Sequence, residues 1–330
     1  ESNISLSHME DDIDQNQVNF LGEFDFVTTQ RNALDWQNNL RLNATNLLTA
    51  GLYISREDTE SLSFGTAFDV STDVDAVYVQ DVMNFNAHQL VLATRYTDHE
   101  TAGSETTWNI DYGYDLSEKL KLTAAAGTAF RAPDSTDRFG FGGNPNLRSE
   151  TARNLEIGLR WRLSSNQNLT VSIFDTQIDD LITIDFSQFP STAQNIEKAS
   201  IRGIELRHDL VKGNWRYSSE VILQETEDEQ TGAPLPRRAD RSLSSSISRL
   251  FGRHEISLNL LATDERKDSP FSQIINAGYV LLNLQGRLQI NPKLSLNGKI
   301  ENLLDRDYQT AAGFNNPDRS VFVSLNYTMR

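Results

Sequence analysis

From Thr106 to the C-terminus, nearly every segment alternates apolar and polar residues, in runs of about ten separated by short polar turns. Successive side chains of a strand project to opposite faces of a sheet. The run 154–163 is the clearest strand of this kind, with Leu155, Ile157, Leu159 and Trp161 on one face and Glu156, Arg160 and Arg162 on the other. Sustained over a whole chain, the pattern predicts an all-β fold, an antiparallel transmembrane β-barrel with its apolar face towards lipid.

The composition fits a barrel better than a helical membrane protein. Hydrophobic residues make up 38% of the 330 residues, and the mean hydropathy is -0.47. A membrane-spanning helix needs roughly 20 consecutive apolar residues, and the sequence contains no such run. A barrel strand needs an apolar residue only at every second position, so a polar average is expected. Cysteine is absent, which excludes disulfides and thiolate metal sites.

Acidic residues outnumber basic ones by 46 to 30, which gives a net charge of -16. We therefore expect no nucleic-acid partner, because phosphate contacts require a basic surface. Clustered carboxylates could bind divalent cations, but solvated loop residues are the simpler explanation. Asp69, Asp73 and Asp75 resemble a calcium loop only faintly, since the glycine turn and the terminal glutamate of such a loop are missing.

No catalytic constellation emerges from the sequence. The five histidines are scattered, without the spacing of metal ligands. We therefore expect a protein that is not an enzyme and has no catalytic residue, no metal ligand and no cofactor. Two alternatives of a different class stay open, a passive porin and an outer-membrane enzyme.

Connections between the predicted strands alternate in length. Short turns are expected near 43–46, 84–87, 115–118, 164–166, 211–214, 251–253 and 291–292. Long polar loops are expected near 11–30, 58–69, 131–150, 179–194, 226–236, 264–277 and 305–318. Bacterial barrels have short periplasmic turns and long extracellular loops, and the segments add up to about 16 strands. The alternation is less regular before Val70.

Four local motifs are more specific than the alternation. They are Phe130-Arg131-Ala132-Pro133, Gly143-Asn144-Pro145-Asn146-Leu147 ending in Glu150, Ile201-Arg202-Gly203-Ile204-Glu205-Leu206, and Glu301-Asn302-Leu303-Leu304-Asp305-Arg306-Asp307-Tyr308. In this order and spacing they resemble the C-terminal barrel of TonB-dependent outer-membrane transporters. The stretch Pro234-Leu235-Pro236-Arg237-Arg238-Ala239 and the segment from Asn302 to Thr328 are similar to the cobalamin-importing members of that family.

The motif residues also have architectural roles to play. Pro133 and Pro145 stop ladder pairing where a strand meets its loop. Gly203 relieves crowding within a strand where another backbone or a plug approaches. Asn302 and Asp305 favour a turn that ends a strand.

The resemblance implies more architecture than this chain contains. Such transporters have an N-terminal plug and a barrel of about 22 strands, so about six barrel strands would be missing. The plug, the segment that binds TonB and the calcium-binding loops of the cobalamin branch would precede Glu1. We therefore expect residues 1–330 to be the C-terminal portion of the barrel of a larger polypeptide, with the plug domain absent.

The resemblance also implies a function, active import of cobalamin across the outer membrane. The implied partners are cobalamin or a similar metal chelate, the TonB complex, and outer-membrane lipid and lipopolysaccharide. Arg237 and Phe314 fall where the cobalamin transporters place substrate-contacting residues, although the family tends to have Tyr at the second position. A receptor for a siderophore or another metal chelate is the alternative within the same fold.

Overall fold

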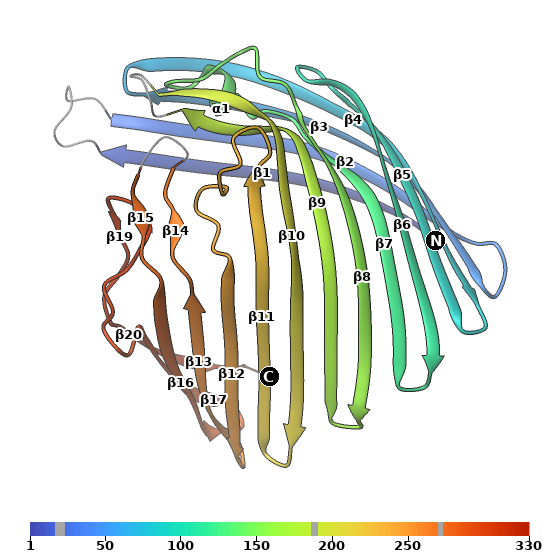
Figure 1. Ribbon diagram of the computed structural model, residues 1–330, viewed down its shortest axis with the longest axis vertical. Coiled ribbons are helices and arrows are strands. Elements are labelled where there is room, and N and C mark those ends of the chain that lie inside the picture. Colours follow the sequence, from blue (N-terminus) through green and yellow to red (C-terminus); the bar gives the residue numbers. More distant parts are fainter. Residues whose placement is uncertain (17–23, 186–190, 270–272, 330) are drawn as a thin grey trace. The chain divides into compact units, whose positions relative to one another are not determined.

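The computed structural model has an all-β fold built on a 16-stranded antiparallel sheet, as the alternation predicts. It describes residues 1–16, 24–185, 191–269 and 273–329. The strands follow one another in the sheet in chain order, so each strand between the edge strands β1 and β20 pairs with the strand of the sheet before it and the one after it (Figure 1). The strands are β1 (Ser2–Asn16), β2 (Phe24–Arg41), β3 (Asn46–Ser63), β4 (Thr66–Phe85), β5 (His88–His99), β6 (Gly103–Ser117), β7 (Leu120–Arg131), β8 (Glu150–Ser164), β9 (Gln167–Asp185), β10 (Thr192–Lys212), β11 (Trp215–Asp228), β12 (Arg241–Phe251), β13 (His254–Thr263), β16 (Tyr279–Asn291), β17 (Leu294–Glu301) and β20 (Ser320–Tyr327).

The chain packs as two compact units, which are described separately below. The first comprises Glu1–Tyr114, Ala124–Leu155 and Thr176–Ser200, and the second comprises Asp115–Thr123, Glu156–Asp175 and Ile201–Arg330. Strands β1–β5 belong to the first unit, as does β6 up to Tyr114, and β11, β12, β13, β16, β17 and β20 belong to the second.

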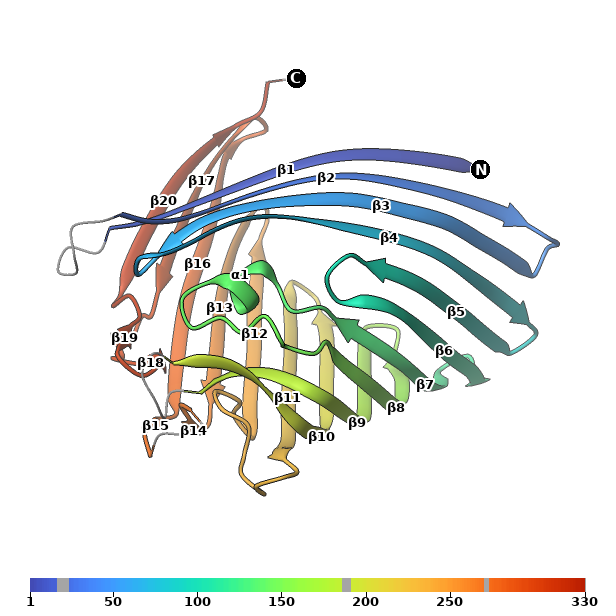
Figure 2. The same ribbon diagram turned by 90° about the horizontal axis from the view of Figure 1, so that it is seen from above.

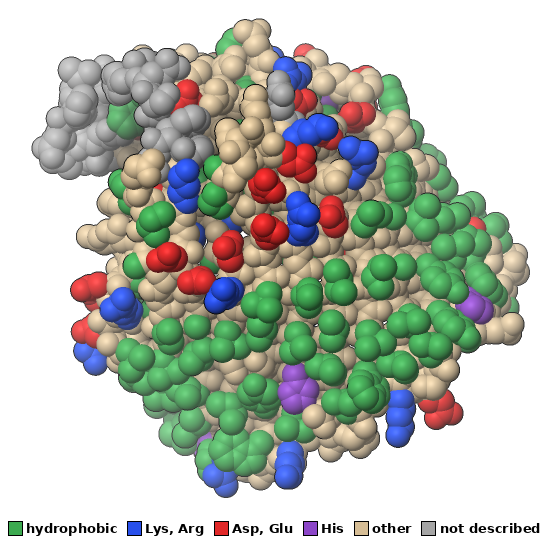
Figure 3. Space-filling model, in the orientation of Figure 1, with side chains coloured by type: hydrophobic (Ala, Val, Ile, Leu, Met, Phe, Trp, Pro, Cys, Tyr) green, Lys and Arg blue, Asp and Glu red, His purple; other side chains and the backbone are tan. Residues whose placement is uncertain are grey.

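The apolar strand faces are exposed. On β8, Leu155 is 61% exposed and Ile157 is 67% exposed, so this face is not packed against a second sheet. Over β10–β12, Figure 3 shows hydrophobic side chains gathered in a band, with charged side chains concentrated beyond it towards the loops. Among the described residues, Leu235 is the largest side chain that is fully buried. An ordinary layered core would bury many such residues, and the lipid-facing assignment of Leu155 and Ile157 is therefore supported.

None of the described helices is long and apolar enough to cross a membrane. That finding has no bearing on strands.

The predicted short turns match the structure, but three of the predicted long loops are too long. The sequence places a loop at Asp58–Asp69, whereas β3 and β4 continue to Ser63 and Thr66, which pair directly. Phe64 and Gly65 make the turn with φ of 48° and 79°. The loops predicted at 11–30 and 179–194 are likewise shortened by β1, β2, β9 and β10, and parts of both lie outside the described residues. At the ends of β3 and β4, polar residues lie on both faces, so the strands pair on although the contrast in hydropathy between the faces has ended.

Three loops contain secondary structure that the alternation does not reveal. The helix α1 (Ser135–Phe139) follows β7, and Asp134 and Asp137 form a capping box at its N-terminus. The ribbon β14 (Arg266–Lys267) with β15 (Ile275–Asn276) follows β13. The ribbon β18 (Gln309–Ala311) with β19 (Phe314–Asn315) follows β17. Figure 2 shows these two ribbons close together at the loop end of the second unit.

Adjacent residues on β16 give a direct test of the two strand faces. Leu284 shares the apolar face with Leu288, and Gln285 projects from the opposite face. A charge on a lipid-facing strand position costs about 2–4 kcal/mol near the bilayer midplane. We expect Leu284→Arg to impair membrane assembly more than Gln285→Arg, measured as the fraction of folded protein in isolated outer membranes. Equal tolerance of the two substitutions would contradict the assigned faces.

Candidate functional site

The predicted ligand residues Arg237 and Phe314 lie in two different loops of the second unit. Arg237 is in the connection between β11 and β12, and Phe314 begins β19. A third loop, which contains β14 and β15, links them. We refer to the described residues of these three connections (229–240, 264–269 with 273–278, and 302–319) as the loop cluster.

The backbone of Arg237 is fixed by its neighbours in the loop cluster. Its φ is +57°, a left-handed conformation that is uncommon for a residue with a side chain. Its N–H donates to the carbonyl oxygen of Lys267 over 2.6 Å. The Nε atom lies 3.4 Å from Oδ1 of Asp268, while 48% of the side chain is exposed. Arg237 is thus oriented by one carboxylate and still presents much of its guanidinium to solvent.

Asp268 connects all three loops of the cluster. The residue is only 8% exposed. Besides Arg237, its Oδ1 accepts hydrogen bonds from Nδ2 of Asn276 and from the backbone N–H of Ala312, both over 2.8 Å. A buried carboxylate needs such partners, because removal from water without them is costly.

The pKa of Asp268 reflects the balance between burial and these partners. Burial raises the pKa, while the Ala312 N–H, the Asn276 amide and the Arg237 guanidinium lower it. The result is a pKa below the ordinary value of 3.8, so the carboxylate is charged at neutral pH. It therefore neutralises Arg237 and steers the guanidinium.

Phe314 projects from the tip of its ribbon and is 71% exposed. The turn before it is shaped by Gly313, whose φ is +83° and whose N–H donates to Oε1 of Gln309. Two residues before Phe314, Ala312 is held by Asp268. The structure therefore ties Phe314 to Arg237 through one intermediate carboxylate.

The loop cluster has further supports in Leu235 and Arg266. Leu235 is 1% exposed, and its N–H donates to Oγ1 of the buried Thr226. Arg266 is 8% exposed, donates to the carbonyl oxygen of Gln309, and lies 5.2 Å from the ring centroid of Tyr279. Both residues anchor loops that contain candidate ligand residues.

A family model for the β-barrel of TonB-dependent receptor-like proteins matches residues 3–303. The chain belongs to this family. TonB-dependent receptor barrels reside in the outer membrane, so the exposed apolar strand faces are the lipid-facing faces and the loop cluster lies at the end with long loops.

Curated relatives of this TonB-dependent receptor barrel include two bacterial transporters. The chain is 28% identical over 310 residues to the vitamin B12 transporter BtuB of Photobacterium profundum, and 27% identical over 311 residues to that of Vibrio vulnificus. Each match covers 91% of this chain and 50% of the relative. The chain thus spans about half the length of the curated relatives it matches.

Solved structures show the same fold at lower identity. The copper transporter OprC superposes with a TM-score of 0.81 at 15% identity, covering 99% of this chain and 62% of that one. A mutant of the ferric enterobactin receptor PfeA from Pseudomonas aeruginosa gives a TM-score of 0.80 at 16% identity, with coverages of 99% and 59%.

Two of the family motifs are bonded to each other in the first unit. Arg131 donates to Glu150 over 2.7 Å and to Asp137 of α1 over 3.0 Å. Glu150 in turn accepts from the N–H of Ile182. Burial and then the neighbouring Asp134 carboxylate raise the pKa of Asp137 above 3.8. These residues fasten the long loop after β7 to the start of β8.

The last family motif shapes the exit from β17. Asn302 is 4% exposed and has a φ of +49°, and Asp305 has a φ of +53°. The Asn302 side chain donates to and accepts from the backbone of Arg306. Asp305 accepts from both the backbone and the side chain of Arg319. The motif therefore closes the base of the loop that contains Phe314.

Gly203, in the remaining motif, allows close contact within the sheet. A Cβ atom built on it would lie 2.5 Å from the Leu223 carbonyl oxygen and 2.8 Å from the Phe174 ring. The close approach that its sequence position predicts is thus made by the neighbouring strand β11 and by an aromatic side chain of β9.

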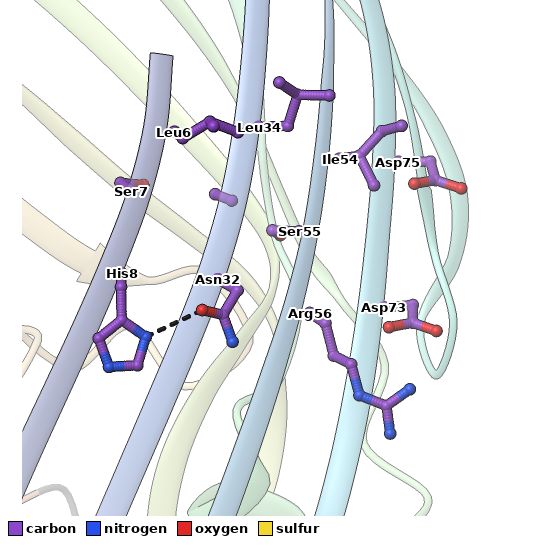
Figure 4. Close-up of a pocket in the computed structure, with 11 residues that line it drawn as sticks. Leu6, Ser7, His8, Asn32, Leu34, Ile54, Ser55, Arg56, Asp73 and Asp75 are labelled. Carbon is purple, nitrogen blue, oxygen red and sulfur yellow. Dashed lines mark hydrogen bonds between the residues drawn. The ribbon is translucent and has the colours of Figure 1, made fainter.

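A hollow of about 710 Å³ on the first unit marks a boundary on the apolar face. One row of cross-strand partners is Leu6, Leu34, Ile54 and Asp75, and the next row towards the loops is His8, Asn32, Arg56 and Asp73. Figure 4 shows both rows, with the hydrogen bond from His8 to Asn32. Apolar side chains give way to polar ones here, so the hollow lies at the outer edge of the lipid-facing band rather than in a ligand site.

Sequence reasoning missed the central residue of the site. Asp268 is one of 46 acidic residues, and no local pattern distinguishes it. Among the residues that the structure describes, no group of three or more His, Asp or Glu side chains is placed to hold a metal ion.

The central role of Asp268 can be tested by removing its carboxylate. Asp268→Ala leaves the Asn276 amide, the Ala312 N–H and the Arg237 guanidinium without their common acceptor, a loss of roughly 1–3 kcal/mol. We expect faster amide hydrogen exchange at Ala312 and Arg237, measured by mass spectrometry. The control Asp307→Ala removes an exposed carboxylate from the same cluster and should leave both amides unchanged. If the amides of Ala312 and Arg237 are as well protected from exchange in Asp268→Ala as in the unchanged protein, Asp268 does not hold the loops together.

The loop cluster should also respond to pH in a defined direction. The folded-state pKa of Asp268 lies below the unfolded value of 3.8, so its stabilisation is complete above about pH 3.8 and is lost as pH falls through the lower, folded-state pKa. We expect protection of Ala312, corrected for the intrinsic exchange rate, to hold from neutral pH down to that window and then to fall. Loss of protection already near pH 6 would contradict the assignment.

Proposed function

We propose that this barrel is part of an outer-membrane importer that takes up cobalamin or a similar large metal chelate with energy from TonB. The observation that carries the proposal is that the single carboxylate of Asp268 holds both the Arg237 side chain and the backbone N–H of Ala312, two residues before Phe314 in a different loop. The named relatives at 27–28% identity, both vitamin B12 transporters, support the choice of ligand. The proposed role involves no chemical conversion of the ligand.

Arg237 supplies the polar half of the proposed contact. Asp268 occupies its Nε edge, and the remaining guanidinium N–H groups can donate to amide or phosphate oxygens of the ligand. Because the carboxylate fixes the side chain in advance, less rotamer entropy is lost on binding than for an unrestrained arginine.

Phe314 supplies the apolar half. An aromatic ring that is 71% exposed at a ribbon tip has much surface to bury, and a flat corrin face is a suitable partner. A tyrosine, the residue that the family tends to have here, would keep the same ring contact and add a hydroxyl.

The strands have a different task in this proposal. They form the wall and, through their loops, part of the extracellular rim, while a plug displaced by TonB opens the path. Partners of the intact protein are accordingly the chelate on the outside and the TonB complex on the periplasmic side.

A receptor for a siderophore or another metal chelate is the second candidate. It is favoured by the structural similarity to a copper transporter and a ferric enterobactin receptor, which reaches TM-scores of 0.81 and 0.80. A guanidinium beside an exposed aromatic ring would also suit an anionic iron chelate. The ligand-binding experiment separates the two candidates.

Equilibrium binding of radiolabelled cobalamin to the intact purified protein tests the proposal. Loss of a donor to a polar ligand group costs roughly 1–3 kcal/mol, or about five- to 150-fold in affinity. We expect Arg237→Ala to weaken binding within that range. The neighbouring exposed Arg238 offers a matched control, since Arg238→Ala removes the same charge from the same loop.

A second series of variants tests the contact made by the Phe314 ring. We expect Phe314→Ala to weaken binding through lost apolar contact and Phe314→Tyr to preserve it. Arg160 lies within β8, away from the loops, so the Arg160→Ala variant should bind cobalamin like the unchanged protein. If the protein binds a ferric chelate and no cobalamin, the proposed substrate is wrong, but the family membership stands. If Arg237→Ala and Arg238→Ala have equal effects, Arg237 is not part of the binding site.

A further inference from the structure

Arg249 is a basic residue on a lipid-facing strand face. Its cross-strand partners are Trp215 on β11 and Ile256 on β13. Directly paired residues project from the same face of a sheet, and Trp215 and Ile256 are 44% and 51% exposed on the apolar face. Arg249 also lies two residues from the end of β12, at the short turn before β13. It therefore marks the edge of the apolar band at the end with short turns.

Aromatic rings, rather than carboxylates, surround the Arg249 guanidinium. Its Cζ lies 4.9 Å from the ring centroid of Trp215 and 4.5 Å from that of Phe251. Among the described residues, none of the ion pairs includes Arg249, whereas Arg216, on the opposite face of β11, pairs with Glu255.

A guanidinium without a carboxylate partner at a membrane interface can be paired by an anionic group of the membrane lipid. Cation–π contacts hold the group in place but do not use its forked N–H donors. Phosphate oxygens match that fork, and the bilayer provides phosphates at this depth.

A groove in the apolar face lies beside Arg249. Gly286 on β16 and Gly298 on β17 are direct cross-strand partners, and a Cβ built on either would meet open space. The groove around them has a volume of about 750 Å³ and is lined mainly by Ile256, Leu284, Leu288, Ile300 and Val323. Two adjacent strands without side chains thus leave a trough between rows of aliphatic side chains.

The cation and the groove belong to one row of the sheet. Arg249 pairs with Ile256, Ile256 with Gly286, Gly286 with Gly298, and Gly298 with Val323. Neighbouring strands are roughly 5 Å apart, which puts the first glycine about 10 Å from the β12 backbone. Phe251 both contacts the guanidinium and lines the groove.

We propose that this surface binds one phospholipid of the periplasmic leaflet. Its phosphate accepts hydrogen bonds from Arg249 between Trp215 and Phe251, and one acyl chain lies in the trough over Gly286 and Gly298. We assign the site to the periplasmic leaflet because Arg249 lies beside a short turn, and short turns are periplasmic in bacterial barrels. The site is independent of the transported ligand and rests only on the membership of this chain in an outer-membrane barrel family.

Native mass spectrometry of the intact protein, titrated with phosphatidylglycerol or with diacylglycerol of the same chains, tests the site. We expect one phosphatidylglycerol to be retained and diacylglycerol to bind much more weakly. Arg249→Gln should weaken phosphatidylglycerol binding about tenfold, and Arg249→Lys should give a smaller loss because the charge remains. The double substitution of Gly286 and Gly298 by Val should weaken both lipids by filling the trough.

Matched controls come from the opposite face of the sheet. Arg216→Gln on β11 and Ser257→Val on β13, next to Ile256, change residues that do not line the groove and should leave lipid binding unaltered. If the glycine variants do not fold, lipid binding by the Arg249→Gln variant still tests the proposal. Unchanged phosphatidylglycerol binding by Arg249→Gln, equal binding of diacylglycerol, or Arg249-dependent binding of lipid A in place of phospholipid would overturn the proposal.

Discussion

Backbone hydrogen bonding is the constraint on which the rest of the structure depends. Hydrocarbon offers no partner to a peptide N–H or C=O group, so a strand that crosses a membrane must be paired along its length. In the 16-stranded sheet, every strand between the edge strands β1 and β20 meets this need by pairing with a strand on either side. The side chains then do not need to form a layered core, and those on one face of the sheet can contact lipid. Loops beyond the last paired residues have water available, and there the chain adopts the helix α1, the two ribbons and several left-handed residues.

Much of the fold could be predicted because the alternation that encodes it is local. The faces of β8, the short turns and the number of strands in the sheet follow from hydropathy at successive positions. The prediction was wrong where both faces are polar, as in the outer parts of β3 and β4. There the register continues to Ser63 and Thr66 through backbone pairing, and hydropathy carries no signal. Secondary structure within the loops, such as α1 and the two ribbons, likewise has no period long enough to detect.

The candidate site could be predicted only in part. Arg237 and Phe314 were found through resemblance to a family, and their ligand contacts stay predictions. Asp268 was missed because its role depends on Arg237, Asn276 and Ala312 meeting from three loops, which no spacing in the sequence expresses. Arg249 was missed for a similar reason, since its surroundings are aromatic rings from β11 and β12.

The single carboxylate shared by three loops has a consequence for how the rim behaves as a whole. Groups joined through one acceptor do not contribute independently, and substitutions among them are generally non-additive. A ligand that draws the Arg237 guanidinium away from Asp268 would change the partner set of the same oxygen that holds Ala312. The three loops of the loop cluster are therefore better described as one coupled element than as three independent ones.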